Sequence, residues 1–271
     1  MEGLKLLHEF GLSYVFAFIG GACMGSFLNV VIHRWPLGES IVKPGSHCPS
    51  CGTSIPWYWN LPLISWVILR GKCRWCKAPI SARYLVVEFM GGAWAVLSLL
   101  RFGPSIAALA CFIFGAALIA GSAIDLYHRL LPDTITLGLV PLGIGMSLLP
   151  DSWTAGWEVD WYESLIGLGS GAGLFLFVLL VFKLLTGKEG MGMGDVKLMA
   201  GVGAVLGYMS LPMVILIGGL GGVLAWLVLY VMGAANRDFQ VPFGPFLSVG
   251  AMAVIMLWPL LEKYLLINHI I

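Results

Sequence analysis

The sequence predicts an all-α membrane protein that crosses the bilayer about eight times and carries one small cytosolic module between its first and second transmembrane helices. The first observation is composition: 59% of the 271 residues are hydrophobic, 11% are charged, and the mean hydropathy is +0.92. Soluble domains average roughly 45–50% apolar and about 25% charged residues. The second observation is that long apolar runs recur along the chain, while cysteines and tryptophans gather between residues 33 and 83.

The first apolar run covers residues 10–32, which exceeds the roughly 20 residues that span a bilayer. A cleaved signal peptide has an apolar centre of only about 7–15 residues. We therefore expect an uncleaved anchor, with residues 1–32 forming the first transmembrane helix. The later apolar runs predict a membrane-embedded core of about seven helices within residues 84–271. These runs cover residues 84–100, 105–124, 134–149, 162–185, 196–208, 211–233 and 243–266.

Basic residues are unevenly distributed between the predicted loops. With the amino terminus outside, four loops face the cytosol, and with their flanks they hold twelve of the fifteen Lys and Arg residues. These loops cover residues 33–83, 125–133, 186–195 and 234–242. Because cytosolic loops carry an excess of Lys and Arg, this orientation is the expected one. The net charge of +1 lacks the basic character of a nucleic-acid-binding chain, so no nucleic-acid partner is expected.

Four cysteines form two CxxC pairs that are separated by 21 residues, close to the spacing of four-thiolate zinc sites. They are Cys48, Cys51, Cys73 and Cys76. Disulfide pairing is the alternative, which a reducing cytosol disfavours. Because four protein ligands leave no open position for substrate, we expect residues 33–83 to form a four-cysteine zinc module with a structural ion. Cys23 and Cys111 lie in apolar runs and are expected to be small buried hydrophobic residues.

Two aspartates lie where predicted membrane helices meet cytosolic loops. Asp125 follows one apolar run, and Asp195 precedes another. An ionised side chain is costly near lipid, so each needs a partner, water or a chemical task. Asp195 could instead cap a helix N-terminus, where carboxylates are favoured. Asp133 follows Pro132 and is expected to cap a helix or organise the loop, with a direct catalytic role as the alternative.

The central hypothesis is that Asp125 and Asp195 are the catalytic pair of an intramembrane-type aspartyl protease. Two acids that share a site cannot both ionise readily, so one stays protonated while the other is anionic. The anion can take a proton from water as the water attacks a peptide carbonyl. The acid can polarise that carbonyl and then protonate the departing amine. The sequence leaves open which aspartate begins protonated.

Glycines near Asp195 favour this hypothesis, because without a β-carbon they can adopt positive backbone angles and let an extended peptide approach closely. They are Gly190, Gly192 and Gly194. Four further glycines alternate within one apolar run and are expected to serve helix packing. They are Gly167, Gly169, Gly171 and Gly173.

Six stretches together make the chain similar to a known enzyme family. In order they are Gly25-Ser26-Phe27-Leu28-Asn29-Val30-Val31 with Arg34 and Pro36; the two CxxC pairs; Ile80-Ser81 with Arg83-Tyr84 and Glu88; Asp125 with Leu131-Pro132-Asp133; Gly192-Met193-Gly194-Asp195-Val196-Lys197; and Pro242-Phe243-Gly244-Pro245-Phe246. Across essentially its whole length, the sequence resembles the bifunctional type IV prepilin peptidases, the leader peptidases and N-methyltransferases of pilus and type II secretion systems.

This resemblance implies that Asp125 and Asp195 are the catalytic aspartates and that the four cysteines bind zinc in the first cytosolic loop. The implied substrates are prepilins or pseudopilins, which are cut after a glycine at the end of a short basic leader. The implied location is the bacterial inner membrane, where lipid surrounds the helices and the active site faces the cytosol. The resemblance alone implies N-methylation of the new amino terminus with S-adenosylmethionine, and it assigns no residues to the methyl donor.

Two other readings of the chain are a peptidase that lacks methyltransferase activity and a zinc-dependent membrane transporter or scaffold. Two side chains near the proposed chemistry also have open roles. Glu88 is expected to be structural, with a place in the reaction chamber as the alternative. Lys197 could approach Asp195 or extend to the membrane interface.

Overall fold

The computed structural model describes residues 2–150, 152–154, 156–188, 190–234 and 241–267. Residues 235–240, which include most of the fourth predicted cytosolic loop, lie outside this description. The described residues form helices and no β-sheet, since their strand-like pairing is limited to two isolated bridges, His47 with Ser54 and Lys72 with Pro79. The protein is therefore all-helical, as predicted.

Five of the described helices contain stretches long and apolar enough to cross a membrane. They are α1 (Glu2–Arg34), α3 (Ala82–Phe102), α4 (Ile106–His128), α7 (Trp161–Thr186) and α9 (Leu211–Val231). Two shorter apolar stretches cover Asp133–Ser147 and Gly244–Leu260. The chain is thus a polytopic membrane protein, while the number of eight spans stays a prediction.

The predicted run 134–149 is divided into α5 (Asp133–Thr136) and α6 (Leu139–Ser147). Pro141 explains the break, because proline has no N–H to donate to the carbonyl of Leu137, four residues earlier, and its ring crowds that carbonyl. Proline is tolerated in the first turn of a helix, which is where α6 places it. Local chemistry therefore interrupts a stretch that hydropathy alone predicts to be continuous.

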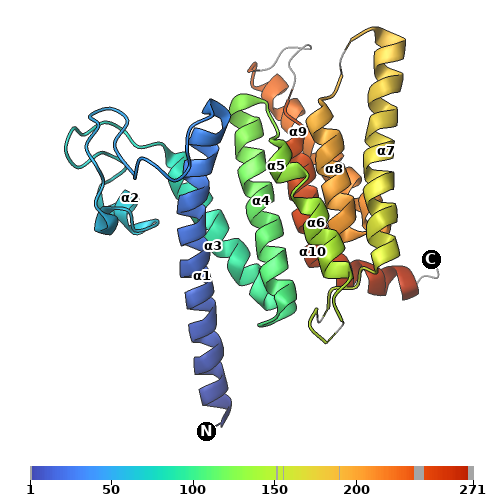
Figure 1. Ribbon diagram of the computed structural model, residues 1–271, viewed down its shortest axis with the longest axis horizontal. Coiled ribbons are helices and arrows are strands. Elements are labelled where there is room, and N and C mark those ends of the chain that lie inside the picture. Colours follow the sequence, from blue (N-terminus) through green and yellow to red (C-terminus); the bar gives the residue numbers. More distant parts are fainter. Residues whose placement is uncertain (1, 151, 155, 189, 235–240, 268–271) are drawn as a thin grey trace. The chain divides into compact units, whose positions relative to one another are not determined.

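Residues Met1–Ala120 form one compact unit, in which α1 packs along α3 (Figure 1). Glycines permit the close approach: a β-carbon at Gly21 would collide with the carbonyl oxygen of Gly91, and one at Gly25 would lie 2.6 Å from the Cα of Glu88. The α1 and α3 backbones therefore contact each other directly. In the same unit, α3 is joined to α4 by a 2.8 Å hydrogen bond that Trp94 Nε1 donates to the carbonyl of Cys111.

Residues Gly121–Ile271 form the second compact unit, in which α8 (Met193–Leu206) is the most buried helix and packs against α6 and α7 (Figure 1). Gly167 and Gly171 let α7 approach α8, because a β-carbon at either would collide with the α8 backbone. Gly169 and Gly173 face open space instead. The packing role predicted for the four glycines is therefore right for the first pair and wrong for the second.

Candidate active site and cysteine cluster

The two predicted catalytic acids lie at helix ends within the second unit. Asp125 is in the last turn of α4, and Asp195 is in the first turn of α8. Both side chains are buried, with 7% of Asp125 and 8% of Asp195 exposed. The α8 helix begins at Met193, after Gly192 in an extended conformation, so Asp195 belongs to the helix rather than to the preceding loop.

The carboxyl group of Asp195 is in an environment that favours its neutral form. Asp195 lies outside the five candidate spans and the two shorter apolar stretches. Burial, and then the negative charge of Asp125, raise the pKa of Asp195 to about 6, against a hydrogen bond with the backbone of Gly192 that lowers it. The two carboxyl groups are therefore within electrostatic reach of each other, and the bond to Gly192 gives Asp195 a capping role as well.

The carboxylate of Asp125 is approached by the first residue of α10 (Gly244–Ile267). The Gly244 backbone N–H hydrogen-bonds to this carboxylate, and Arg129 interacts with it electrostatically. A β-carbon at position 244 would lie 2.7 Å from Asp125 Oδ2 and 3.1 Å from Leu131 Cδ1. A residue without a side chain is required here, because Asp125 occupies the space that a methyl group would need.

Leu131 also contacts the segment before Asp195, where a β-carbon at Gly194 would lie 2.9 Å from Leu131 Cβ. Gly192 has a φ of −80°, and Gly194 lies within α8, so neither glycine uses the positive backbone angles that its missing side chain would allow. The glycine at 194 is instead required by a close approach. Likewise, a β-carbon at Gly190 would collide with the ring of Phe182.

Lys197 pairs with Asp133 rather than with either predicted catalytic acid. Its Nζ lies 2.6 Å from Asp133 Oδ1 and 2.8 Å from Oδ2, which joins α8 to the first residue of α5. The side chains are 33% and 60% exposed. Asp133 therefore organises the loop, as expected. Lys197 therefore pairs with Asp133 and not with Asp195, while its extension to the membrane interface stays a prediction.

The four predicted metal ligands converge on one point in the first unit. Their Sγ atoms all lie within 4.8 Å of one another, and Cys48 Sγ is 3.7 Å from Cys76 Sγ. A tetrahedral zinc ion with Zn–S bonds of about 2.3 Å needs sulfurs about 3.8 Å apart, so the cluster fits this ion. All four are free cysteines. Hydrogen bonds with Thr53 lower the pKa of Cys51 to about 6. Against a hydrogen bond with the backbone of Ala78, burial and the neighbouring cysteine thiols raise the pKa of Cys76 to about 11, so the support for a metal is the convergence of the four sulfurs.

The two CxxC turns repeat the same backbone pattern. The Gly52 amide donates to the Cys48 carbonyl at 2.8 Å, and the Lys77 amide donates to the Cys73 carbonyl at 3.0 Å. Gly52 and Lys77 both have positive φ angles, of 69° and 62°. The left-handed conformation is therefore occupied by glycine in the first turn and by lysine in the second.

Glu88 has the structural role that was expected for it. It is only 6% exposed, and its Oε2 accepts a 2.7 Å hydrogen bond from the backbone N–H of Leu63. Leu63 has a φ of 61° and precedes α2 (Ile64–Ile68). Of the two cysteines outside the cluster, Cys111 is buried as expected, whereas Cys23 is exposed, which corrects its prediction.

Sequence reasoning gave no role to Gly244 or Leu131. Gly244 belongs to one of the six stretches that carry the family resemblance. The signal that could have identified it is a glycine between Phe243 and Pro245 at the very start of the predicted apolar run 243–266. Its contact with Asp125 depends on long-range packing, which local spacing does not specify.

The described residues define a multi-pass helical membrane protein with two buried acids at helix ends and four cysteines that could hold a metal ion. Residues 19–102 match the bacterial peptidase A24 N-terminal domain, and residues 112–227 match the type IV leader peptidase family. The chain belongs to the type IV leader peptidase family. It is thus a bacterial multi-pass membrane protein of a peptidase family.

Several curated relatives carry the name prepilin leader peptidase/N-methyltransferase. One from Burkholderia pseudomallei (strain 1026b) is 39% identical over 270 residues, covering 90% of this chain and 85% of the relative. One from Aeromonas hydrophila is 34% identical over 294 residues, covering 98% and 99%. One from Stutzerimonas stutzeri is 36% identical over 282 residues, covering 95% of each. No solved structure matches the chain.

Proposed function

We propose that the chain is an aspartyl endopeptidase that removes the leader from type IV prepilins or pseudopilins and then N-methylates the new amino terminus. The peptide bond that is cleaved lies directly after a glycine of the substrate, at the cytosolic face of the bacterial inner membrane. The observation that carries the proposal is that the side chains of Asp125 and Asp195 are both buried at helix ends that meet at Leu131. This leucine lies against Gly194, next to Asp195, and against Gly244, which touches the Asp125 carboxylate. The names of the relatives support the substrate class and the second reaction.

In the proposed cleavage, Asp125 and Asp195 share one proton. The anionic carboxylate takes a proton from water while the water oxygen bonds to the peptide carbonyl carbon. The protonated carboxyl group polarises the carbonyl and then transfers its proton to the departing nitrogen as the C–N bond breaks. Gly244 donates its backbone N–H to Asp125 and so orients this carboxylate.

The cysteine cluster is assigned a structural zinc ion, because four thiolates complete a tetrahedral shell and leave no position for a substrate. Residues 33–83 then form a module that is stabilised by its metal, while the residues of the core hold the acid pair. When bound, S-adenosylmethionine supplies an electrophilic methyl group. The amine nitrogen of the new terminus bonds to the methyl carbon, the C–S electron pair remains on sulfur, and the nitrogen loses a proton.

The test is incubation of the purified, zinc-loaded chain in detergent with a prepilin and isotope-labelled S-adenosylmethionine, followed by mass analysis of the product's amino terminus. The expected product is shortened and carries one labelled methyl group. A shortened but unmethylated product would show a peptidase that lacks methyltransferase activity. An intact prepilin with wild-type protein would contradict the proposal and favour a transporter or scaffold.

A further inference from the structure

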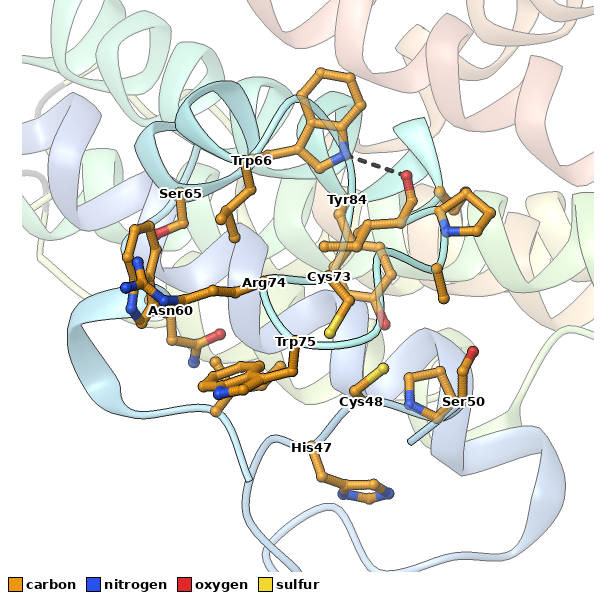
Figure 2. Close-up of a pocket in the computed structure, with 18 of the residues that line it drawn as sticks. His47, Cys48, Ser50, Asn60, Ser65, Trp66, Cys73, Arg74, Trp75 and Tyr84 are labelled. Atoms are coloured by element: carbon orange, nitrogen blue, oxygen red, sulfur yellow. Dashed lines mark hydrogen bonds between the residues drawn. The ribbon is translucent and has the colours of Figure 1, made fainter. Parts of the chain in front are cut away.

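The first unit contains a cavity of about 330 Å³ to which the proposed cleavage chemistry gives no role (Figure 2). Its lining comes from both CxxC turns, from α2 and from the beginning of α3. Small-molecule pockets have volumes of about 300–1,000 Å³ and mostly apolar walls with a few well-placed polar groups. The cavity has the size of a site for a compact organic ligand.

Aromatic side chains make up much of the cavity wall. Trp59, Trp66, Trp75 and Tyr84 all line it. Trp66 is held in place by a 3.3 Å hydrogen bond from its Nε1 to the carbonyl of Ile80, which is the dashed line in Figure 2. Flat aromatic faces bind planar heterocycles by stacking and bind cations through the ring quadrupole.

The cavity also combines charged groups of opposite sign. Glu88 is the one carboxylate among its lining residues, and Arg74 and Arg83 bring guanidinium groups. The Arg74 guanidinium lies 4.6 Å from the centre of the Trp59 ring, so it is fixed against the wall. Cys48 and Cys73 line the cavity too, and four thiolates around one divalent ion carry a net negative charge.

One buried polar atom in the lining lacks a partner. Ser65 is 8% exposed and lines the cavity, and its Oγ has no hydrogen-bond partner among the described residues. Buried hydroxyl groups are normally hydrogen-bonded, and an unpaired one is destabilising. Figure 2 shows Ser65 beside Trp66 at the cavity edge, where a ligand with hydroxyl or ring-nitrogen groups would satisfy it.

We propose that this cavity binds the methyl donor, S-adenosylmethionine, an inference that rests on the methyltransferase part of the proposed function. The donor has a planar purine for the tryptophan faces and a sulfonium cation for the aromatic and negatively charged wall. Its amino-acid carboxylate matches the guanidinium of Arg74, and its hydroxyl groups and ring nitrogens can pair with Ser65. The metal cluster and the donor site then share Cys48 and Cys73 as a common wall.

The test measures donor binding to the full, zinc-loaded chain by titration calorimetry with S-adenosylmethionine, in the absence of prepilin. Ser65→Ala is expected to weaken binding about tenfold, since one hydrogen bond is lost. Without donor, its melting temperature should stay equal or rise, because the variant removes an unpaired buried hydroxyl group. Trp75→Ala is expected to weaken binding at least tenfold through loss of a stacking wall.

Trp57→Ala is the matched control, because Trp57 lies in the same module, is 79% exposed and does not line the cavity. Its donor affinity should stay within twofold of wild type. Zinc content is measured for each variant. If Trp75→Ala loses zinc, its weaker donor binding has a second explanation, and the inference is then judged from the donor affinity of Ser65→Ala alone. Unchanged donor affinity in Ser65→Ala would overturn the inference.

Two further results separate this inference from the proposed function. If the wild-type chain methylates a prepilin while Ser65→Ala keeps full donor affinity, the donor binds elsewhere and the proposed function stands. If the wild-type chain neither binds the donor nor methylates, both the inference and the methyltransferase assignment fail. Prepilin cleavage, measured on the same sample, tests the peptidase assignment independently.

Discussion

Gly244 lies directly against the carboxylate of Asp125, where a β-carbon would be 2.7 Å from Oδ2. Its backbone also hydrogen-bonds to this carboxylate. The start of α10 therefore forms one wall of the acid pair, and the wall is the main chain itself. Any side chain at position 244 must displace either Asp125 or Leu131.

Gly244→Ala should reduce leader cleavage at least tenfold while the protein still folds, because a displacement of about 1 Å in a catalytic group can cost a hundredfold in rate. Initial rates on a purified prepilin and the melting temperature of the variant measure the two effects. Gly219→Ala is the control, since a β-carbon there meets nothing within 4 Å. Equal rates for Gly244→Ala and wild type would remove the proposed role of this contact.

Asp125→Asn and Asp195→Asn should each lower kcat for leader cleavage by about 10²–10⁴-fold, the usual contribution of general acid and base groups. Mass analysis of the prepilin product measures this loss. Asp133→Asn is the matched control, because this exposed acid pairs with Lys197, and cleavage should stay within a few-fold of wild type. Intact cleavage in either active-site variant would end the aspartyl assignment.

Asp195→Asn should also stabilise the protein above pH 6. Burial raises the pKa of Asp195 to about 6, against an ordinary value of 3.8, so the folded state holds the proton more tightly than the unfolded state. The resulting stability of wild type is present below pH 3.8 and is lost as the pH rises to about 6. The variant's advantage in melting temperature should therefore be greater at pH 7.5 than at pH 4.5, and a constant difference would contradict this.

Lys77→Gly should stabilise the cysteine module by about 1 kcal/mol, because a left-handed conformation is costly for a residue with a side chain. Gly52 occupies the equivalent position of the first CxxC turn. The midpoint urea concentration for zinc release measures the change. Lys72→Gly serves as the control, since Lys72 has no positive φ, and it should lower the midpoint. A lower midpoint for Lys77→Gly would show that the left-handed turn carries no strain.

Zinc removal should disorder the cysteine module while affecting the acid pair less. The four thiolates lie close together, so without the ion they lose the bond that holds the two turns to each other. Hydrogen exchange before and after chelation should show the largest increase within residues 33–83, with smaller changes at α8. A uniform increase along the chain would instead make the ion essential to the whole fold.

Hydropathy located most of the long helices because a membrane helix is recognised from its own residues: about 20 consecutive, mostly apolar positions. It failed where one residue acts on its neighbours: Pro141 divides the predicted run 134–149 into two helices. The cysteine cluster was predictable because ligand spacing is local, and the spacing agrees with four converging sulfurs. Two other interactions were not predictable, because each joins segments far apart in the chain. They are the contact of Gly244 with Asp125 and the hydrogen bond from Leu63 to Glu88.

The hydrogen bond between Leu63 and Glu88 has a consequence for how the protein can be dissected. The composition boundary at residue 83 cuts the chain before Glu88, and a soluble fragment that ended there would leave the amide of Leu63 without its acceptor. Such a fragment would also lack Tyr84 from the cavity wall. A fragment intended to reproduce the metal module in solution has to extend into the first turns of α3 and bring part of a membrane helix with it.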